Sequence, residues 1–235
     1  MQGWSRTVRQ YVKLALLAAF GARAQEQVPW AEFGNDGYGS WRIDPRPINS
    51  QSIAYTFGVG DDISFDRAVA AKLGARVFAF DPTPESVQWM AQQRDLPDTL
   101  AFLPFGVAGV TEQREFLKLD STALMCFTSD PAMRGATPSG RVVCSVKSLR
   151  DIMNELGHDH LDICKLDVEG CEYEVIDSIV SDKIPIRQLL VEFHFPWSPG
   201  GLLKMRRYLK RLESIGYRIF AVTHNREISF CRVTG

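Results

Sequence analysis

The sequence has no surplus of charge of either sign. Its 235 residues include 27 Lys and Arg against 28 Asp and Glu, which gives a formal net charge of −1 at pH 7. A protein that holds a nucleic-acid backbone needs clustered Lys and Arg to neutralise the phosphates. We therefore expect no nucleic-acid partner.

The cysteines form no recognisable framework. There are five, an odd number, and no two of them form a C-x-x-C pair. Disulfide-rich folds and structural zinc sites both depend on such spacings. Neither class is indicated, and no metal ligand is assigned from the sequence.

A hydrophobic run long enough to cross a membrane is also missing. The apolar run at residues 14–22 falls short of the roughly 20 residues that a spanning helix needs. Basic residues precede this run and an Ala-Arg-Ala sequence ends at residue 24, which is typical of a signal peptide over residues 1–24. Apolar residues at helical spacing from Val8 to Ala19 instead favour an amphipathic helix. We favour the helix, and with it a cytoplasmic rather than a secreted protein; no pattern indicates an oligomeric state.

What the sequence does contain is a regular alternation of strand and helix patterns. Residues 1–50 hold the N-terminal helix (or signal-like segment) and a loop-rich lead-in, and residues 51–235 form one main domain. Strands are predicted at 52–58, at 75–80, at the start of 100–109, and at 141–146, 161–167 and 186–195. Helices are predicted at 62–73, 84–94, 148–157, 169–180 and 201–216, a ribbon at 114–119, a loop at 128–140 and a closing hairpin at 217–223 and 227–233.

This alternation predicts a doubly wound α/β fold, in which helices cover both faces of a mostly parallel sheet. The closing hairpin predicts one antiparallel strand at the edge. Ligands of such folds bind beyond the carboxyl ends of the strands. We therefore look for functional residues at strand ends.

The first predicted strand ends in a glycine turn, Gly58-Val59-Gly60, that opens a helix. Glycine lets the backbone approach a ligand closely. The second strand ends in Asp81-Pro82, and Asp81 follows Gly60 by 21 positions, the spacing expected of a carboxylate that binds a ribose diol. A tight turn without a ligand, and a helix N-cap at Asp81, are the alternatives.

Acidic residues at the glycine turn indicate which nucleotide fits. A pyrophosphate-containing dinucleotide favours a third glycine and an unobstructed helix N-terminus. Asp61 and Asp62 occupy that place and would repel a pyrophosphate, whereas they tolerate the amino group and sulfonium of S-adenosylmethionine. NAD is disfavoured on charge.

A third strand carries a run of carboxylates at its end. Asp167 ends the strand, and Glu169, Glu172 and Glu174 follow it. Carboxylates at this place can orient a hydroxyl, take its proton or hold a metal. We favour a functional role for Asp167. For Glu172 and Glu174 we favour a stabilising interaction with the N-terminus of the next helix.

The next strand ends with Glu192 and His194, two residues apart and therefore on one side of the strand. Burying both groups is costly unless they are paired. Glu192 and His194 are candidates for the same site as Asp167, with a purely structural Glu–His pair as the alternative. The other histidines fall in predicted loops and are assigned no role.

Five segments together resemble the FkbM-type S-adenosylmethionine-dependent methyltransferases, in the branch with a YGGW motif. They are DGYGSW (36–41), YTFGVGDDISFD (55–66), VFAFDPTPESV (77–87), LDICKLDVEGCEYEVI (161–176) and LLVEFHF (189–195), and the resemblance covers residues 36–223. It implies a Rossmann-like class I methyltransferase fold with a seven-stranded, mostly parallel sheet and an antiparallel edge hairpin. Residues 51–235 would be the methyltransferase domain.

Carried over residue by residue, the resemblance assigns the cofactor site and the transfer centre. The cofactor loop would be lined by Gly58, Val59, Gly60 and Asp61. The ribose would be bound by Asp81, which is followed by Pro82, and the adenine would lie near Phe105, Gly106 and Val107. Asp167 would face the methyl group. Two positions depart from the pattern. Phe57 stands where many methyltransferases of this fold have an acidic residue, and Ser40 replaces a glycine of the YGGW motif.

The resulting hypothesis is methylation of a hydroxyl on a small molecule or sugar-like acceptor. Asp167 would orient the acceptor, and His194 or Glu192 would accept its proton. A divalent cation bridging Asp167 and Glu192 is a variant that would lower the pKa of the hydroxyl without a base. Three other classes stay open: a nicotinamide-dependent oxidoreductase, a catalytically silent binding or interaction module, and a methyltransferase that acts on protein or nucleic acid, with nucleic acid the least favoured acceptor.

Overall fold

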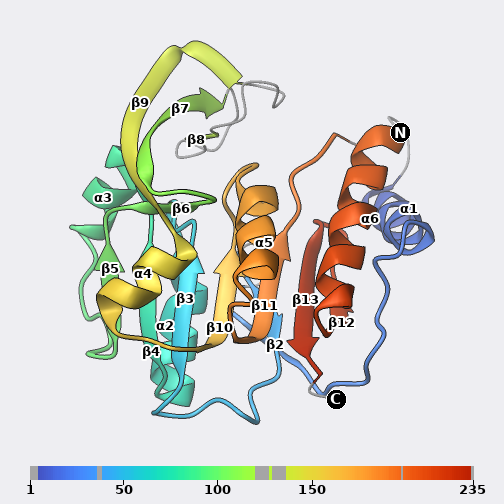
Figure 1. The fold of residues 1–235 in the computed structure, drawn as a ribbon, viewed down its shortest axis with the longest axis horizontal. Coiled ribbons are helices and arrows are strands. Elements are labelled where there is room, and N and C mark those ends of the chain that lie inside the picture. Colours follow the sequence, from blue (N-terminus) through green and yellow to red (C-terminus); the bar gives the residue numbers. More distant parts are fainter. Residues whose placement is uncertain (1–4, 36–38, 120–126, 129–135, 197, 234–235) are drawn as a thin grey trace.

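The computed structural model describes residues 5–35, 39–119, 127–128, 136–196 and 198–233. Its centre is a seven-stranded sheet (Figure 1) in the order β12-β13-β11-β10-β3-β4-β5. These strands are β3 (Ile53–Phe57), β4 (Arg76–Phe80), β5 (Leu100–Leu103), β10 (Leu161–Leu166), β11 (Ile186–Glu192), β12 (Tyr217–Val222) and β13 (Glu227–Arg232). The predicted doubly wound α/β fold with a seven-stranded, mostly parallel sheet is confirmed.

The antiparallel strand lies elsewhere than predicted. β13 is antiparallel to both β11 and β12 and is inserted between them, so β12 is the edge. After β11 the chain therefore skips the neighbouring position in the sheet, forms β12 at the edge, and returns as β13 between β12 and β11. The central strands β3 and β10 are buried along their whole length, as expected of parallel strands that are covered on both faces.

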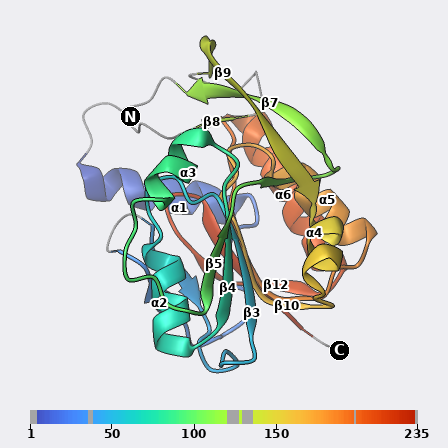
Figure 2. The ribbon, with the colours of Figure 1, turned by 90° about the vertical axis from the view of Figure 1, so that its left-hand side faces the viewer.

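Helices cover the two faces of the sheet (Figure 2). One face carries α2 (Ser64–Leu73) and α3 (Pro84–Met90), and the other carries α4 (Leu149–Leu156), α5 (Glu172–Ser181) and α6 (Pro199–Ser214). The apolar stripes of these helices explain the packing: the fully buried Ile176 and Ile179 of α5 join the main core together with Met205 of α6. The sequence predicted each of these helices, with α3 ending earlier than expected.

A second, four-stranded sheet stands over the carboxyl ends of the main sheet (Figure 1). It has the order β6-β9-β7-β8 and consists of β6 (Gly106–Ala108), β7 (Glu112–Leu119), β8 (Phe127–Thr128) and β9 (Ala136–Ser148). The third strand, expected at the start of 100–109, is present as β5. One expectation was wrong here: the loop expected at 128–140 begins in β8, at Thr128, and ends in β9, which starts at Ala136. Residues 129–135 of that loop lie outside the described residues.

The N-terminal region forms α1 (Arg6–Ala19) and a short hairpin of β1 (Ala31–Phe33) and β2 (Trp41–Ile43). The helix predicted for this segment is present, and it lies beside the β12 edge (Figure 1). The hairpin was not expected within the loop-rich lead-in. Among the described helices, none is both long and apolar enough to cross a membrane.

Candidate active site

Three parallel strands end around Gly58, and its lack of a side chain allows them to meet. Gly58 adopts a φ of 87°, and a Cβ there would lie 1.8 Å from the carbonyl oxygen of Asp167. Its N–H donates to the Phe80 carbonyl at 3.0 Å, and its carbonyl accepts from Lys165 Nζ at 2.8 Å. Any other residue would push the glycine turn away from the end of β10.

Asp81 fixes the glycine turn from the neighbouring strand. Its Oδ2 accepts the N–H groups of Val59 and Gly60, both at 3.0 Å. Its Oδ1 accepts from the N–H and hydroxyl of Thr83 at 2.9 and 2.6 Å. Thr83, not Asp81, is the N-cap of α3. The carboxylate therefore shapes the turn, and a ribose would share oxygens that are already hydrogen-bonded.

An open cavity, here called the glycine-loop cavity, lies over these strand ends. Nearly all residues predicted to bind the cofactor line it: Gly58, Val59, Gly60, Asp61, Asp81, Pro82, Gly106 and Val107. Phe105 lies outside that lining and packs on Phe80, with ring centroids 5.3 Å apart. Phe116 and Phe127 of the second sheet form an apolar wall that the sequence did not predict.

A second open cavity, here called the acidic cavity, also adjoins the glycine turn. Its lining includes Trp41 and five acidic and three basic side chains: Asp62, Asp66, Asp167, Glu192 and Glu227 with Lys13, Lys165 and Arg226. Gly58, Val59 and Asp167 line both cavities. The two aspartates of the glycine turn thus separate, because Asp61 faces the first cavity and Asp62 the second.

The predicted catalytic residues converge on the imidazole of His194. Its Nε2 lies 3.9 Å from Asp167 Oδ1 and 3.7 Å from Glu192 Oε1. Glu169, which lines the glycine-loop cavity, is nearer still, with Oε2 at 3.3 Å. The structure thus brings Asp167, Glu192 and His194 together, as the strand-end argument predicted. Asp167 lines both cavities and Glu192 lines the acidic cavity, whereas His194 lies beside them and lines neither.

Glu172 contacts His194 at its backbone N–H and on the Nδ1 side of its ring. Its side chain is fully buried, and its Oε1 accepts the backbone N–H of His194 at 2.6 Å. Its Oε2 accepts the N–H of Gly170 at 2.8 Å and lies 3.5 Å from His194 Nδ1. The sequence interpretation of Glu172 as a partner of the helix N-terminus missed this role, because nothing in the local pattern shows that β11 ends beside it.

The charges in this cluster depend on one another. Burial alone would lower the pKa of His194, but the attraction of Glu172, Glu192 and Glu169 raises it to about 10. Burial and the charge of Asp167 raise the pKa of Glu192 to about 8, against the attraction of His194. Burial also raises the pKa of Glu169. At neutral pH the imidazole is therefore cationic, and Glu192 is largely protonated until the pH rises to about 8.

Two further residues of the site were not predicted. Lys165, whose side chain is 7% exposed, bonds to the Gly58 carbonyl and lies 3.7 Å from Asp167 Oδ2. Arg226, from the turn between β12 and β13, lies 3.5 Å from Glu192 Oε1. A lysine inside an apolar strand was a signal in the sequence, since a buried amine needs a partner.

Glu169 also shows an unusual backbone. Its φ is 45°, in the left-handed region that residues with a side chain seldom adopt. Strain of this kind persists where neighbouring contacts enforce it, and it is common at functional sites. Here the bond from Gly170 to Glu172 fixes the turn.

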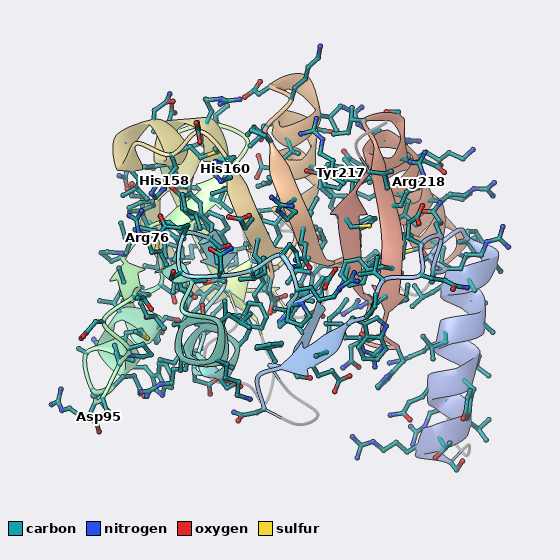
Figure 3. All side chains as sticks on the ribbon, turned by 90° about the horizontal axis from the view of Figure 1, so that it is seen from below. Arg76, Asp95, His158, His160, Tyr217 and Arg218 are labelled. Carbon is teal, nitrogen blue, oxygen red and sulfur yellow. The ribbon has the colours of Figure 1, made fainter. Side chains whose placement is uncertain are left out.

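Another histidine cluster lies at the opposite edge of the sheet, where the parallel strands begin (Figure 3). His160 Nδ1 lies 2.6 Å from Asp159, and its Nε2 lies 3.7 Å from Asp162. His158 Nδ1 pairs with the Tyr55 hydroxyl at 2.6 Å. Neither histidine, and none of the groups paired with them here, lines the two cavities described above.

The family model described as "Methyltransferase FkbM domain" matches residues 31–219. Among curated proteins, the chain is similar to the human and rat proteins named "Probable methyltransferase-like protein 24". Each is 24% identical over 202 residues, which cover 82% of this chain and 47% and 48% of those proteins. The chain thus spans about half the length of the curated relatives it matches.

Solved structures with a related arrangement are distant in sequence. The fibrillarin pre-rRNA processing protein of Methanococcus jannaschii has a TM-score of 0.46 and 11% identity, covering 79% of this chain and 68% of that chain. The fibrillarin of Aeropyrum pernix, in complex with natively bound S-adenosyl-L-methionine, has a TM-score of 0.41 and 12% identity, covering 90% and 84%. The fold assignment given above rests on the strand order of this protein itself.

Proposed function

The chain belongs to the FkbM methyltransferase family, and on this premise we propose that it transfers a methyl group from S-adenosylmethionine to a hydroxyl of a small-molecule or sugar-like acceptor. The observation that carries this proposal is the meeting of two cavities at Asp167. One cavity is built on a glycine turn at a strand end, and the other is polar. A transferase must bind its donor and its acceptor in adjacent sites, so that the reacting atoms of the two molecules meet.

The glycine-loop cavity suits the methyl donor. Its mixed lining offers the backbone of the glycine turn, the carboxylate of Asp81 and the apolar side chains of Val107, Phe116 and Phe127. Hydrogen-bonding groups beside apolar walls are what a nucleoside with a charged amino-acid tail requires. When bound, S-adenosylmethionine supplies an activated methyl group on a sulfonium centre, which the nearby carboxylates of Asp61 and Asp167 tolerate.

The acidic cavity suits a hydroxyl-bearing acceptor. Its carboxylates and basic side chains offer many hydrogen-bond acceptors and donors, and Trp41 adds an aromatic surface. Aromatic rings beside directional polar groups are a suitable surface for a sugar ring, whose faces are apolar and whose edge carries hydroxyls. The mixture of charges favours a polar acceptor over an apolar one.

Within this cluster we assign two roles. Asp167, which lines both cavities, orients the acceptor hydroxyl by accepting its hydrogen bond. Glu192, whose pKa is raised to about 8, would receive the proton in its ionised form, which predominates above about pH 8, as the oxygen–methyl bond forms and the sulfur–methyl bond breaks. Of the two bases considered from the sequence, the cationic state of His194 favours Glu192. His194 then holds the carboxylates in place.

Calorimetric titration with S-adenosylmethionine, S-adenosylhomocysteine and NAD tests the cofactor assignment. We expect micromolar binding of the first two ligands and none of NAD. A matched pair of variants locates the binding site: Asp81→Ala should weaken it, and Asp159→Asn, at the opposite edge, should not. Binding of NAD alone would favour the oxidoreductase, and binding of none of the three would favour a silent module.

A further inference from the structure

The Nε2 atom of His194 points into a group of carboxylates at distances that suit a bound cation. The ligand atoms of Asp167, Glu192 and His194 all lie within 4.8 Å of one another, with Nε2 at 3.7 Å from Glu192 and 3.9 Å from Asp167. A cation held at about 2.1–2.5 Å by two ligands keeps those ligand atoms about 3–5 Å apart. The three residues can therefore share one cation with only small side-chain rotations.

His194 is held in the manner of a metal ligand. Its side chain is 8% exposed, and its Nδ1 is buried without a hydrogen-bond partner in the described part of the chain. The nearest group to Nδ1 is the buried carboxylate of Glu172, at 3.5 Å. Since Glu172 also accepts the backbone N–H of His194, the ring is oriented from behind. A carboxylate behind the ring is the usual support of a metal-bound histidine.

The cations already present compensate this cluster only partly. Lys165 lies 3.7 Å from Asp167, and Arg226 lies 3.5 Å from Glu192. Both separations exceed the roughly 2.7–2.9 Å of a close ionic hydrogen bond. Glu169, 3.3 Å from Nε2, adds a further carboxylate. A divalent cation that takes the place of the proton on His194 Nε2 would therefore be stabilised by these carboxylates.

We propose that Asp167, Glu192 and His194 bind one divalent cation of the Mn²⁺ type, which displaces the proton from His194 Nε2 on binding, with Glu172 as the residue that positions the histidine. Carboxylates suit Mg²⁺, Ca²⁺ and Mn²⁺, whereas imidazole favours transition metals, and Mn²⁺ meets both preferences. The cation would offer open coordination positions to an acceptor hydroxyl. That use of the site rests on the proposed function, but the site itself does not.

Electron paramagnetic resonance of the full chain titrated with Mn²⁺, without any methyl donor, tests the site. The signal of free Mn²⁺ should disappear until one ion is bound per chain, and spin-echo modulation should show one imidazole nitrogen beside the metal. His194→Gln should abolish that modulation. Asp167→Asn and Glu192→Gln should weaken binding by at least the roughly 10- to 100-fold expected for loss of a supporting residue such as Glu172.

The cluster at the opposite edge supplies matched controls. Asp159→Asn and His160→Gln remove the same residue types and should leave Mn²⁺ binding and the imidazole modulation unchanged. Absence of saturable binding in the wild type, or equal binding in folded Asp167→Asn, would overturn the proposal. If a site variant fails to fold, imidazole modulation in the wild type that persists in His160→Gln still supports it. The Mn²⁺ titration contains no methyl donor and is therefore independent of the cofactor assignment. If the protein binds S-adenosylhomocysteine in the calorimetric titration but does not bind Mn²⁺, the cation site is overturned and the proposed function is not.

Discussion

Two histidines of this protein lie among carboxylates at opposite edges of the same parallel sheet. At the carboxyl edge, His194 is 8% exposed, and four carboxylates surround it. At the amino edge, the side chains of His160 and Asp159 are 52% and 95% exposed, and Arg187 pairs with the remaining carboxylate, Asp162, at 3.1 Å.

The difference shows that residue type does not identify the site. Both clusters combine histidine with acidic groups, but water screens the charges at the amino edge. At the carboxyl edge burial strengthens them, and the pKa of His194 rises to about 10. The carboxyl edge also adjoins two cavities, so its charges can act on a ligand.

The largest expected effect is that of Asp167→Asn. Loss of the carboxylate that lines both cavities should lower the rate of methyl transfer by at least about 100-fold, the lower range for a positioned acid or base. Binding of S-adenosylhomocysteine should remain nearly intact. Single-turnover kinetics and calorimetry on the same preparation measure the two quantities, and loss of both would make Asp167 a cofactor ligand or a structural residue.

Glu172→Ala should be the most destabilising of these changes. It leaves the N–H groups of His194 and Gly170 without their acceptor, which should lower the free energy of unfolding by about 2–5 kcal/mol. Glu174→Ala is a matched control on the same helix, because that carboxylate is 37% exposed and pairs with Arg114. It should cost less than about 1 kcal/mol. If the two variants shift the midpoint of urea unfolding equally, the buried hydrogen bonds of Glu172 do not contribute more to stability than the exposed ion pair of Glu174.

Asp81→Ala should act on the cofactor. It removes an acceptor of charge-assisted hydrogen bonds worth roughly 1.5–3 kcal/mol, which corresponds to about 10- to 100-fold in affinity for S-adenosylmethionine. Because Asp81 also holds the N–H groups of Val59 and Gly60, hydrogen exchange of the glycine turn should rise as well. Unchanged affinity would remove Asp81 from the cofactor site.

The smallest effect is expected at the amino edge. His160→Gln should change the free energy of unfolding by no more than about 0.5 kcal/mol, since an exposed ion pair contributes little. Turnover should be unchanged. A clear loss of activity in this variant would contradict the account, because it would show that the exposed cluster at the amino edge also contributes to methyl transfer.

Much of the fold could be predicted from periodicity. The buried runs that became β3 and β10, and the amphipathic stripes of α4 and α6, depend on local sequence alone. The second sheet could be predicted only in part: the ribbon expected at 114–119 and the strand expected at 141–146 lie in β7 and β9, whereas β6 and β8 are only three and two residues long and too short for a periodic pattern. The position of β13 was also out of reach, since strand order depends on packing that a linear pattern does not encode.

The candidate site was predictable where strand ends carry polar residues. Asp167, Glu192 and His194 are found together because parallel strands β10 and β11 end at the same edge. Glu172 and Lys165 were missed for opposite reasons. Glu172 had an adequate local explanation at a helix start, and Lys165 acts through the carbonyl of Gly58, a contact that only the folded chain shows.

A crystal structure of the protein with S-adenosylhomocysteine would test the central claim most directly. We predict that the ligand occupies the glycine-loop cavity, with its ribose at Asp81 and its sulfur directed toward Asp167 and the acidic cavity. A ligand bound elsewhere, or one whose sulfur faces away from Asp167, would contradict the assignment of this edge as the site of methyl transfer.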